Sequence, residues 1–392
     1  MNKYLIISHF SDVNYSGGRF VAYNLILSLA SNKDNEVSVW TNTMPVYQND
    51  YSDVEFSKKI KFIKTLEYKP FILGFYDFII LIPENSHSSI FEKSILTARL
   101  NNSKLILYNF ETPNWFNEYV KIKRNENLWI GWEVVSRYTS LIISISQESS
   151  KYAQSYFKSN CNFKHWYPPL NTFAADLVNP IEKLNQIVII TRFSQSHKGS
   201  DEVYNLFREE FRKFEFKFIV GSGGVSNDVK QKLNRLSEKF QIKSNIYSGI
   251  NELDKFKIIS ESKLMIFFSE FEGLGIPPLE ALYMNTRCLS YYLPVLQETT
   301  DGLIDFCNKD NLYEKMSEIL TNPKIENGKQ LISSKFSFKV CSIKLNEMFS
   351  NGIENNMKLK ELNTLYFFTI IIYKDTLFFI KRITHKIQRC LK

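Results

Sequence analysis

The sequence predicts an α/β protein in which two domains, each built on a parallel sheet, are followed by a short tail. Its 392 residues are enough for two domains with separate cores. In both halves, short apolar runs alternate with polar segments and with apolar residues at helical spacing. The paired prolines in residues 167–171 break helix and sheet between the halves. We therefore expect domains at 1–166 and 167–350 and a tail at 351–392.

The composition is that of a globular protein, with 44% hydrophobic and 23% charged residues. A net charge of +8 suits anionic ligands or an anionic membrane surface, and does not by itself indicate a nucleic-acid partner. The five cysteines are scattered without the spacing of metal ligands, which favours a reducing cytoplasm and no metal site. The N-terminus turns polar too soon for a signal peptide, and no stretch gives an uncharged membrane span.

Apolar runs predict the strands of the first half, at residues 3–9, 36–40, 76–81, 104–108 and 141–146. Gly17 and Gly18 follow the first of these runs and precede a helical pattern, so we expect them in the connecting loop. There they form either a tight turn or a loop that faces a ligand. Their spacing is not the G-x-G-x-x-G fingerprint, which disfavours an NAD site.

The segment 109–116, N-F-E-T-P-N-W-F, follows another strand of the first half. It contains Asn109 and Glu111, and from the residues alone Glu111 is an ordinary surface carboxylate. His9 is the only histidine at a predicted strand end in this half, and a structural role is the preferred interpretation.

Strands of the second half are predicted at residues 186–190, 216–220, 245–249, 263–268 and 287–290. Arg192 and Lys198 follow the first of them. A cationic pair at a strand end can hold a diphosphate, because arginine binds phosphate bidentately and lysine acts as a point charge. Two solvated surface bases are the alternative. A glycine-rich loop at 221–224 follows the next strand.

The most informative segment is 269–282, S-E-F-E-G-L-G-I-P-P-L-E-A-L, between a predicted buried strand and a helix. Gly273 and Gly275 allow close approach of the backbone to a ligand. The two prolines fit a first helical turn, and free backbone N–H groups there attract phosphate or sugar oxygens. We expect Glu272 at the strand end and Glu280 in the first helical turn, both facing the ligand crevice. The alternative is an ordinary connection with two solvated glutamates.

The string E-G-x-G-x-P-P-x-E-A in this segment resembles the E-x7-E signature of retaining glycosyltransferases of family 4. The resemblance implies the GT-B fold, with two Rossmann-like domains facing each other across a cleft. It also implies that Glu272 lies beside the transferred sugar and that Glu280 binds the ribose of the nucleotide. The amides that hold the sugar's hydroxyls would be those of Gly273, Leu274 and Gly275.

Two further segments are similar to the same family. Arg192 to Gly199 resembles its R-x-x-x-x-K-G segment with one extra residue, which implies that Arg192 and Lys198 bind the diphosphate. Gly17-Gly18 resembles its N-terminal glycine loop, which approaches the donor phosphates and the acceptor. Many members carry a histidine in the loop after a first-domain strand, and this chain has none there. The resemblance therefore implies that Glu111 or Asn109 stands in for the histidine on the acceptor side, or that the loop only shapes the acceptor pocket. The catalytic group of the first domain stays open.

The tail changes character after residue 351. Residues 362–373 carry no charge, Lys374 and Asp375 interrupt, and the rest contains five bases and no acid. These bases are Lys381, Arg382, Lys386, Arg389 and Lys392. Two interpretations stay open: a C-terminal helix packed on the first domain, or an interfacial helix whose bases meet anionic lipid. A full span is disfavoured by the charges near its middle.

The residues and the resemblance together predict a retaining glycosyltransferase with Glu272, Arg192 and Lys198 as catalytic residues. It would move a hexose-type sugar from a nucleotide-diphosphate donor to a hydroxyl of a glycan acceptor, a lipid-linked surface-polysaccharide intermediate, without a cofactor. We expect it in the cytoplasm, peripherally bound to the inner face of the plasma membrane. The alternatives are a sugar-nucleotide epimerase on the same fold and a non-catalytic membrane-associated scaffold.

Overall fold

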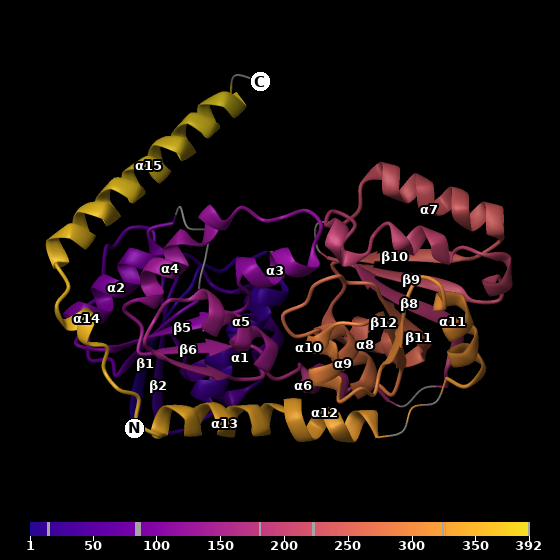
Figure 1. Ribbon diagram of the computed structural model, residues 1–392, viewed down its shortest axis with the longest axis horizontal. Coiled ribbons are helices and arrows are strands. Elements are labelled where there is room, and N and C mark those ends of the chain that lie inside the picture. Colours follow the sequence, from indigo (N-terminus) through magenta and orange to yellow (C-terminus); the bar gives the residue numbers. More distant parts are fainter. Residues whose placement is uncertain are drawn as a thin grey trace. The chain divides into compact units, whose positions relative to one another are not determined.

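The computed structural model describes residues 1–13, 16–82, 88–179, 182–221, 224–323, 325 and 327–390, and the chain folds into two compact units (Figure 1). The first unit comprises Met1–Trp115, Arg124–Trp166 and Ser342–Lys392, and the second comprises Phe116–Lys123 and Tyr167–Cys341. The chain leaves the first unit directly before the paired prolines. It returns to the first unit within α13 (Phe338–Ser350). Residues 342–350, which we expected in the second domain, therefore fold with the first unit, as does the tail.

The first unit is built on a seven-stranded sheet in the order β3-β2-β1-β4-β5-β6-β7, in which all neighbouring strands are parallel. The strands are β1 (Asn2–Ile7), β2 (Asn35–Trp40), β3 (Lys61–Ile63), β4 (Phe78–Leu81), β5 (Lys104–Asn109), β6 (Leu141–Ser144) and β7 (Asn162–His165). The helices are α1 (Gly17–Ala30), α2 (Ile90–Leu100), α4 (Ile130–Ser136), α5 (Gln147–Tyr156), α14 (Met357–Lys360) and α15 (Thr364–Cys390), with most of α13 and the start of α3 (Pro113–Tyr119). Short 3-10 turns lie at Val46–Tyr51, Glu55–Lys59 and Glu126–Trp129.

The second unit has a six-stranded sheet in the order β10-β9-β8-β11-β12-β13, again with parallel neighbours. Its strands are β8 (Leu184–Thr191), β9 (Glu215–Val220), β10 (Ser244–Ser248), β11 (Ser262–Phe267), β12 (Arg287–Tyr291) and β13 (Asp305–Cys307). Its helices are α6 (Thr172–Ala175), α7 (Asn227–Phe240), α8 (Glu252–Glu261), α9 (Ile276–Tyr283), α10 (Pro294–Thr300), α11 (Leu312–Thr321) and α12 (Gly328–Phe336). Short 3-10 turns lie at Ser196–Lys198, Glu202–Leu206 and Glu209–Phe211.

Both sheets are buried on both faces, as parallel sheets require. In the first unit, Leu5, Ile7 and Leu107 are fully buried between helices on either side. In the second unit, Ile187 and Leu264 are buried in the same way. This explains why the central strands read as continuous apolar runs, and all ten predicted strands are present.

The strand order places one topological switch point in each sheet. In the first sheet it lies between β1 and β4, and in the second between β8 and β11, because successive strands are added on opposite sides of β1 and of β8. Ligands of open α/β sheets bind at such points, outside the carboxyl ends of the strands. Most of the predicted site residues follow β1, β8 or β11. Asn109 and Glu111, at the end of β5, lie one strand further along the first sheet.

Candidate functional site

Two loops of the second unit are held together at its switch point. Lys198 ends the 3-10 turn after β8, and its Nζ lies 2.6 Å from Glu272 Oε1 in the loop after β11. The same ammonium donates to the carbonyl oxygen of Phe271 at 3.2 Å. A backbone bond from Glu270 N to the oxygen of His197, 2.7 Å long, ties the loops a second time. The side chains of Lys198 and Glu272 are 20% and 15% exposed, so the ion pair is reachable from solvent but largely shielded from it.

Two glycines permit this close approach. Gly199 has a φ of +69°, and a Cβ there would lie 2.3 Å from the carbonyl oxygen of Phe268. Gly275 has a φ of +85°, and a Cβ there would lie 2.2 Å from Leu296 Cδ2. Any other residue would be strained at both positions and would collide with its neighbour. The Gly-rich spacing of the motif is therefore required by the packing of the loop itself.

The loop before α9 presents free backbone donors. Gly275 is the N-cap of α9 and provides no side-chain cap. Within the described residues, the backbone N–H groups of Leu274, Gly275 and Ile276 have no acceptor at hydrogen-bond distance. The next two residues are prolines without an N–H, so the expected positive pocket is made by residues 274–276 rather than by the whole first turn. Three adjacent donors of this kind suit a phosphate or sugar oxygen.

Glu280 is placed differently from the expectation that it faces the crevice. It lies on α9, is 3% exposed, and its Oε1 is 2.7 Å from Lys255 Nζ on α8. The same ammonium lies 2.8 Å from Glu252 Oε1. Burial raises the pKa of Glu280 to about 7, although Lys255 opposes this shift. The two carboxylates outweigh burial at Lys255 and raise the pKa of its ammonium.

Lys255 and Glu252 are the site residues that sequence reasoning missed. They belong to no recognised motif, and they lie on α8, the helix that follows β10. The only local signal is their spacing of three residues, which is common on helix surfaces.

Arg192 follows β8 directly, and its side chain is exposed. Its Nε lies 4.0 Å from where a Cβ on Gly221 would stand, so it extends along the start of the glycine-rich loop after β9. Among the described residues, its guanidinium makes no hydrogen bond or ion pair. The side chain is therefore available to an anion.

In the first unit, Gly17 and Gly18 begin α1 instead of lying in the loop before it, which corrects the sequence interpretation. The reason is a cap: Ser16 Oγ accepts the backbone N–H of Arg19 at 3.3 Å. Both glycines are exposed and neither has a positive φ. A Cβ on Gly17 would meet nothing within 4 Å, and one on Gly18 would meet only the ring of Phe110 at an ordinary 3.7 Å. The fold of this unit does not require glycine at either position.

The two acceptor-side candidates differ in access. Asn109 is fully buried, and its amide is 3.4 Å from the hydroxyls of Ser144 and Ser149. In this conformation it offers no surface to an acceptor. Glu111 forms an ion pair with Arg124, and its side chain is 27% exposed. The structure thus leaves Glu111 within reach of a ligand and holds Asn109 inside the unit.

His9 lies after β1 and is largely buried. Burial, Arg19 and Lys93 lower the pKa of its imidazole to about 4, and Asp375 opposes them. Its ring is therefore neutral at physiological pH. This agrees with the structural role that the sequence favours.

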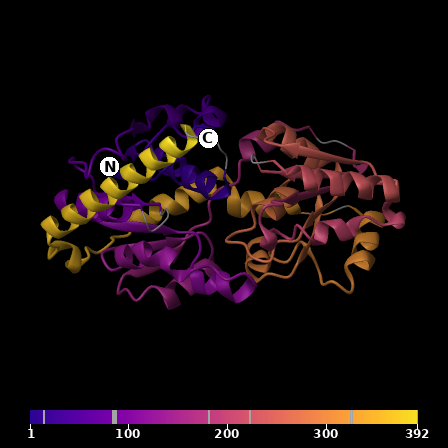
Figure 2. The ribbon, with the colours of Figure 1, turned by 90° about the horizontal axis from the view of Figure 1, so that it is seen from above.

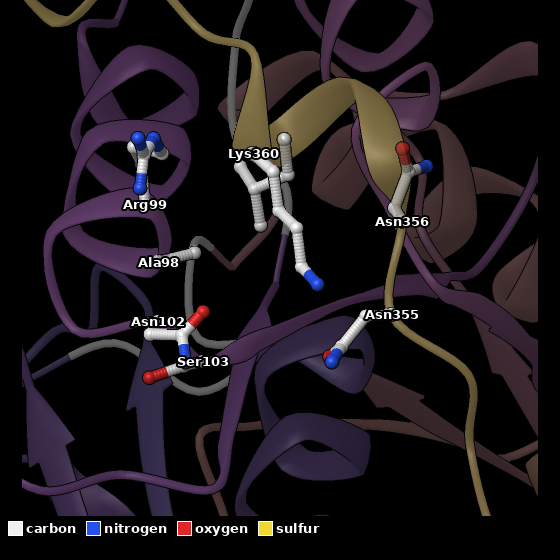
Figure 3. Close-up of a pocket in the computed structure, with 8 residues that line it drawn as sticks. Ala98, Arg99, Asn102, Ser103, Asn355, Asn356 and Lys360 are labelled. Carbon is white, nitrogen blue, oxygen red and sulfur yellow. The ribbon is translucent and has the colours of Figure 1, made fainter.

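A small pocket among the described residues is lined by none of these groups (Figure 3). Residues at the end of α2 and around the start of α14 line it: Ala98, Arg99, Asn102, Ser103, Asn355, Asn356, Leu359 and Lys360. Ser103 directly precedes β5, so the pocket lies at the amino edge of the first sheet. Ligand sites of this fold type lie at the opposite, carboxyl edge. In the described part of the chain, no cluster of His, Cys, Asp or Glu could hold a metal ion.

Comparison with known proteins identifies the second unit. Residues 176–334 match the family model of glycosyl transferases group 1. This part of the chain is similar to the glycosyl transferases of group 1. The matched region contains Arg192, Lys198, Glu272 and Glu280. The resemblance read from the motif is thereby confirmed at the level of the family, while the roles of the individual glutamates stay predictions.

Two curated relatives extend the similarity. An uncharacterized glycosyltransferase of Methanocaldococcus jannaschii is 25% identical over 249 residues, which cover 59% of this chain and 58% of that protein. The alpha-1,3/1,6-mannosyltransferase ALG2 of Dictyostelium discoideum is 24% identical over 333 residues, covering 79% of this chain and 70% of that protein. The chain thus spans between half and three quarters of the length of these relatives.

Solved glycosyltransferases of the GT-B type have the same fold. The match to HepE of Anabaena, in complex with UDP and glucose, covers 90% of this chain and 100% of HepE, with a TM-score of 0.65 and 10% sequence identity. The predicted fold class, two Rossmann-like domains and a helical C-terminal tail, is confirmed. In the described residues, no helix combines the length and apolarity needed to cross a bilayer.

Proposed function

We propose that this protein is a retaining glycosyltransferase that moves a hexose-type sugar from a nucleotide diphosphate to a hydroxyl of a glycan acceptor. One observation carries the proposal: the Lys198–Glu272 ion pair at the switch point of the second sheet, 2.6 Å long, in the loop that also holds the free amides of residues 274–276. A cation, a carboxylate and a row of backbone donors are the groups that a sugar diphosphate needs. All of them lie within the matched glycosyltransferase domain.

The cations would act on the leaving group. When the bond from the sugar to the diphosphate breaks, negative charge grows on the phosphate oxygens. Arg192, exposed and unpaired among the described residues, and Lys198 would stabilise that charge. Electrostatic stabilisation of this kind is usually the largest contribution to catalysis, because the charges are already in place before the reaction.

The carboxylates would act on the sugar and the ribose. Glu272, held by Lys198, would accept hydrogen bonds from sugar hydroxyls and ease positive charge at the anomeric carbon. The amides of Leu274 and Gly275 would donate to the same sugar. Glu280 would accept from ribose hydroxyls, which requires its carboxylate to turn from Lys255 or to share it.

The relatives support the donor and the reaction class. One is a mannosyltransferase, and HepE binds UDP and glucose. A nucleotide-linked hexose is therefore the donor we propose. For the acceptor we propose a lipid-linked intermediate of surface-polysaccharide assembly, presented at the inner face of the plasma membrane, on the basis of the basic, apolar tail.

The first experiment is thermal unfolding of the protein with a panel of UDP, GDP, TDP and ADP sugars. A ligand at about 100 times its Kd stabilises by about 2.7 kcal/mol, which raises the Tm by a few degrees. We expect one nucleotide to raise the Tm of the wild type but not of Lys198→Ala. Glu270→Ala is the matched control, because Glu270 is an exposed carboxylate two residues from Glu272. No shift with any nucleotide would contradict the donor site and favour the scaffold interpretation.

The reaction itself is tested with the nucleotide that binds. Incubated with an acceptor, the enzyme should yield a glycoside whose anomeric configuration, read by NMR, equals that of the donor. Inversion would contradict the retaining assignment. Incubated without an acceptor, it should leave the sugar unchanged, and the appearance of a second nucleotide sugar would identify an epimerase instead.

A further inference from the structure

Helix α15 packs closely against the first unit along only half of its length, and among the described residues a single further ion pair, Arg382 with Glu67 at 3.3 Å, holds its outer half. Phe367 and Ile371 are buried against that unit. Further along, Lys374 pairs with Glu92 at 2.7 Å and Asp375 with Lys93 at 2.9 Å, both at the start of α2. From residue 376 to residue 384 every side chain is exposed. Figure 1 shows α15, in yellow, beginning beside α14 and α2 and continuing past them, and Figure 2 gives the same helix from above.

The outer face of α15 is apolar. A helix repeats every 3.6 residues, so the face opposite the buried and ion-paired residues is known from their positions. Large apolar side chains occupy that face and much of the outer half, each at least 39% exposed: Leu365, Tyr366, Ile372, Tyr373, Leu377, Phe378, Phe379, Ile380 and Ile383. Monomeric soluble proteins rarely expose so many neighbouring apolar groups, so this surface is a binding surface.

A loop of the first unit adds to the same surface. It connects β3 to β4, and its Phe71 ring contacts Phe368 of α15 at 6.4 Å between centroids. In the same loop, within residues 68–75, Tyr68 is 80% exposed and Phe75 is 91% exposed. The loop is therefore a second exposed apolar element beside α15.

The charge of this region indicates what covers it. After Asp375 the sequence has five Lys or Arg and no acid; Lys381 is exposed at the end of the apolar stretch, and Arg382 beside it is 56% exposed although it pairs with Glu67. A protein partner that buried the apolar face would be under no constraint to be acidic, whereas a bilayer with anionic headgroups offers apolar depth and negative charge together. Aromatic and aliphatic groups enter the boundary of such a bilayer, and the bases meet its headgroups.

We propose that the outer face of α15, together with the 68–75 loop, is a lipid-binding surface that holds the protein on a membrane containing anionic lipid. The helix lies in the plane of the headgroups with its apolar face inward. The ion pairs of Lys374 and Asp375 with α2 keep the first unit fixed to the bound helix.

The anchor also orients the first unit. Because α2 follows β4, its first turn lies at the carboxyl edge of the parallel sheet, and Asp375 docks there. The outer half of α15 therefore starts from the edge where α1, with Gly17 and Gly18, also begins. A membrane bound to this helix would keep that edge close to the headgroups. This step rests on the proposed function, because it matters only if the acceptor is attached to lipid.

The test is flotation of the full chain with vesicles of phosphatidylcholine alone and of phosphatidylcholine mixed with phosphatidylglycerol. We expect binding to the mixed vesicles to be at least about tenfold tighter, since each base near an anionic surface adds a factor of about five. Lys381→Gln should weaken binding to mixed vesicles by a factor of about five and leave binding to neutral vesicles unchanged. Equal binding to both vesicles, or to neither, would overturn the proposal.

The apolar contribution has its own variant and matched control. Ile372, Phe379 and Ile383 form one outward stripe, and their joint replacement by serine should abolish flotation while leaving the fold intact, because all three are exposed. The control replaces Ile122, Leu177 and Leu303 of the second unit, which are also exposed, by serine and should float like the wild type. Equal loss in both variants would contradict a specific surface.

Two further measurements separate the explanations. If α15 instead covers a second copy of the chain, light scattering without lipid should show a dimer that the stripe variant abolishes, and vesicles should bind weakly; that result would overturn the proposal. The stripe variant should retain the full thermal shift with the donor nucleotide. If the stripe variant no longer floats but keeps its thermal shift with the donor nucleotide, the lipid-binding surface is supported independently of the donor site. If the wild type shows no thermal shift, the donor site is contradicted and the lipid-binding surface is not.

Discussion

Lys255 Nζ lies 2.7 Å from Glu280 Oε1 and 2.8 Å from Glu252 Oε1, so that one ammonium pairs with two carboxylates. Glu280 lies on α9, which follows the candidate donor loop, residues 268–275. With all three groups ionised, the cluster carries one uncompensated negative charge in a site where the Glu280 side chain is 4% exposed. Burial, with a smaller contribution from the charge of Glu252, therefore raises the pKa of Glu280 to about 7 despite its cation. The cluster is therefore able to change its charge near neutral pH.

Lys255→Met should destabilise the second unit strongly. The substitution leaves Glu280 buried without a cation, and breaking a buried pair in this way costs about 3–5 kcal/mol. We expect the free energy of unfolding, measured in urea, to fall by roughly that amount at pH 8 and by less at pH 5, where Glu280 is protonated.

Lys257→Met is the matched control, because Lys257 is an exposed lysine on the same helix. It should change the free energy of unfolding by less than about 0.5 kcal/mol. The double variant Lys255→Met with Glu280→Gln should recover much of the loss, because it removes the unpaired charge as well. A double variant as unstable as the single one would show that lost packing, not the buried charge, is responsible.

The pH dependence of stability follows from the direction of the Glu280 shift. Its pKa rises from 4.5 to about 7 on folding, so the folded state binds more protons than the unfolded state between these values. The resulting stability is fully present below pH 4.5 and is lost as the pH rises through 7. A shift of this size corresponds to a loss on the order of 3 kcal/mol.

Glu280→Gln isolates this contribution, because glutamine does not titrate. Urea unfolding from pH 5 to pH 8 should show wild-type stability falling relative to the variant over that range. A constant difference between the two proteins would mean that Glu280 stays ionised throughout. The comparison uses the difference between the proteins, so the titration of other groups cancels.

The central strands could be predicted because they are buried on both faces and read as unbroken apolar runs. The edge strands β3, β7 and β13 could not, because they are short and only partly buried and so lack an apolar run; β7, N-F-K-H, is mostly exposed. The start of α1 was misplaced for a different reason. Two glycines indicate a loop. The helix nevertheless begins at Gly17, because the hydroxyl of the preceding Ser16 caps it, and a single hydroxyl is a weak signal in a sequence.

The candidate site shows the same division. The pairing of Lys198 with Glu272 follows from topology, because both residues stand after neighbouring parallel strands. The burial of Glu280 does not follow from its motif, since its partner Lys255 lies 25 residues earlier on another helix. Contacts of this kind depend on how helices pack across a sheet, which no local pattern records.

Glu272→Gln should reduce kcat far more than it changes the fold. The side chain loses its charge beside Lys198 and beside the sugar, and loss of one such electrostatic group costs roughly a hundredfold or more in rate. Lys198→Met should act in the same direction, because it removes the cation that we propose stabilises the leaving diphosphate. The measurement is kcat and KM with the nucleotide sugar found in the thermal panel.

Glu270→Gln provides the comparison for both variants. Glu270 is exposed, and its backbone rather than its side chain joins the two loops. Its kcat should stay within about twofold of the wild type, and the circular dichroism of all three variants should match. A hundredfold loss in Glu270→Gln would show that any charge change in this loop is harmful, and the roles of Glu272 and Lys198 would lose their support.

Gly275→Ala should unfold the donor loop locally. A Cβ there would lie 2.2 Å from Leu296 Cδ2, in a backbone with a φ of +85°. Strain and collision together should lower the free energy of unfolding by about 1–3 kcal/mol. Leu296→Ala combined with Gly275→Ala should relieve the collision but not the strain. A fully stable single variant would mean that the loop adopts another conformation in solution.

Gly17→Ala tests a glycine that the fold does not require, in contrast to Gly275. The φ at this position is not positive, a Cβ would meet nothing within 4 Å, and alanine is favoured over glycine in a helix. The variant should therefore be as stable as the wild type or slightly more so. If the open space at the start of α1 is kept for a ligand, the same variant should raise KM for donor or acceptor at least severalfold. Unchanged stability with unchanged KM would mean that no ligand comes close to this helix end. The combination of a stable fold and impaired binding would assign the glycine to the substrate rather than to the fold.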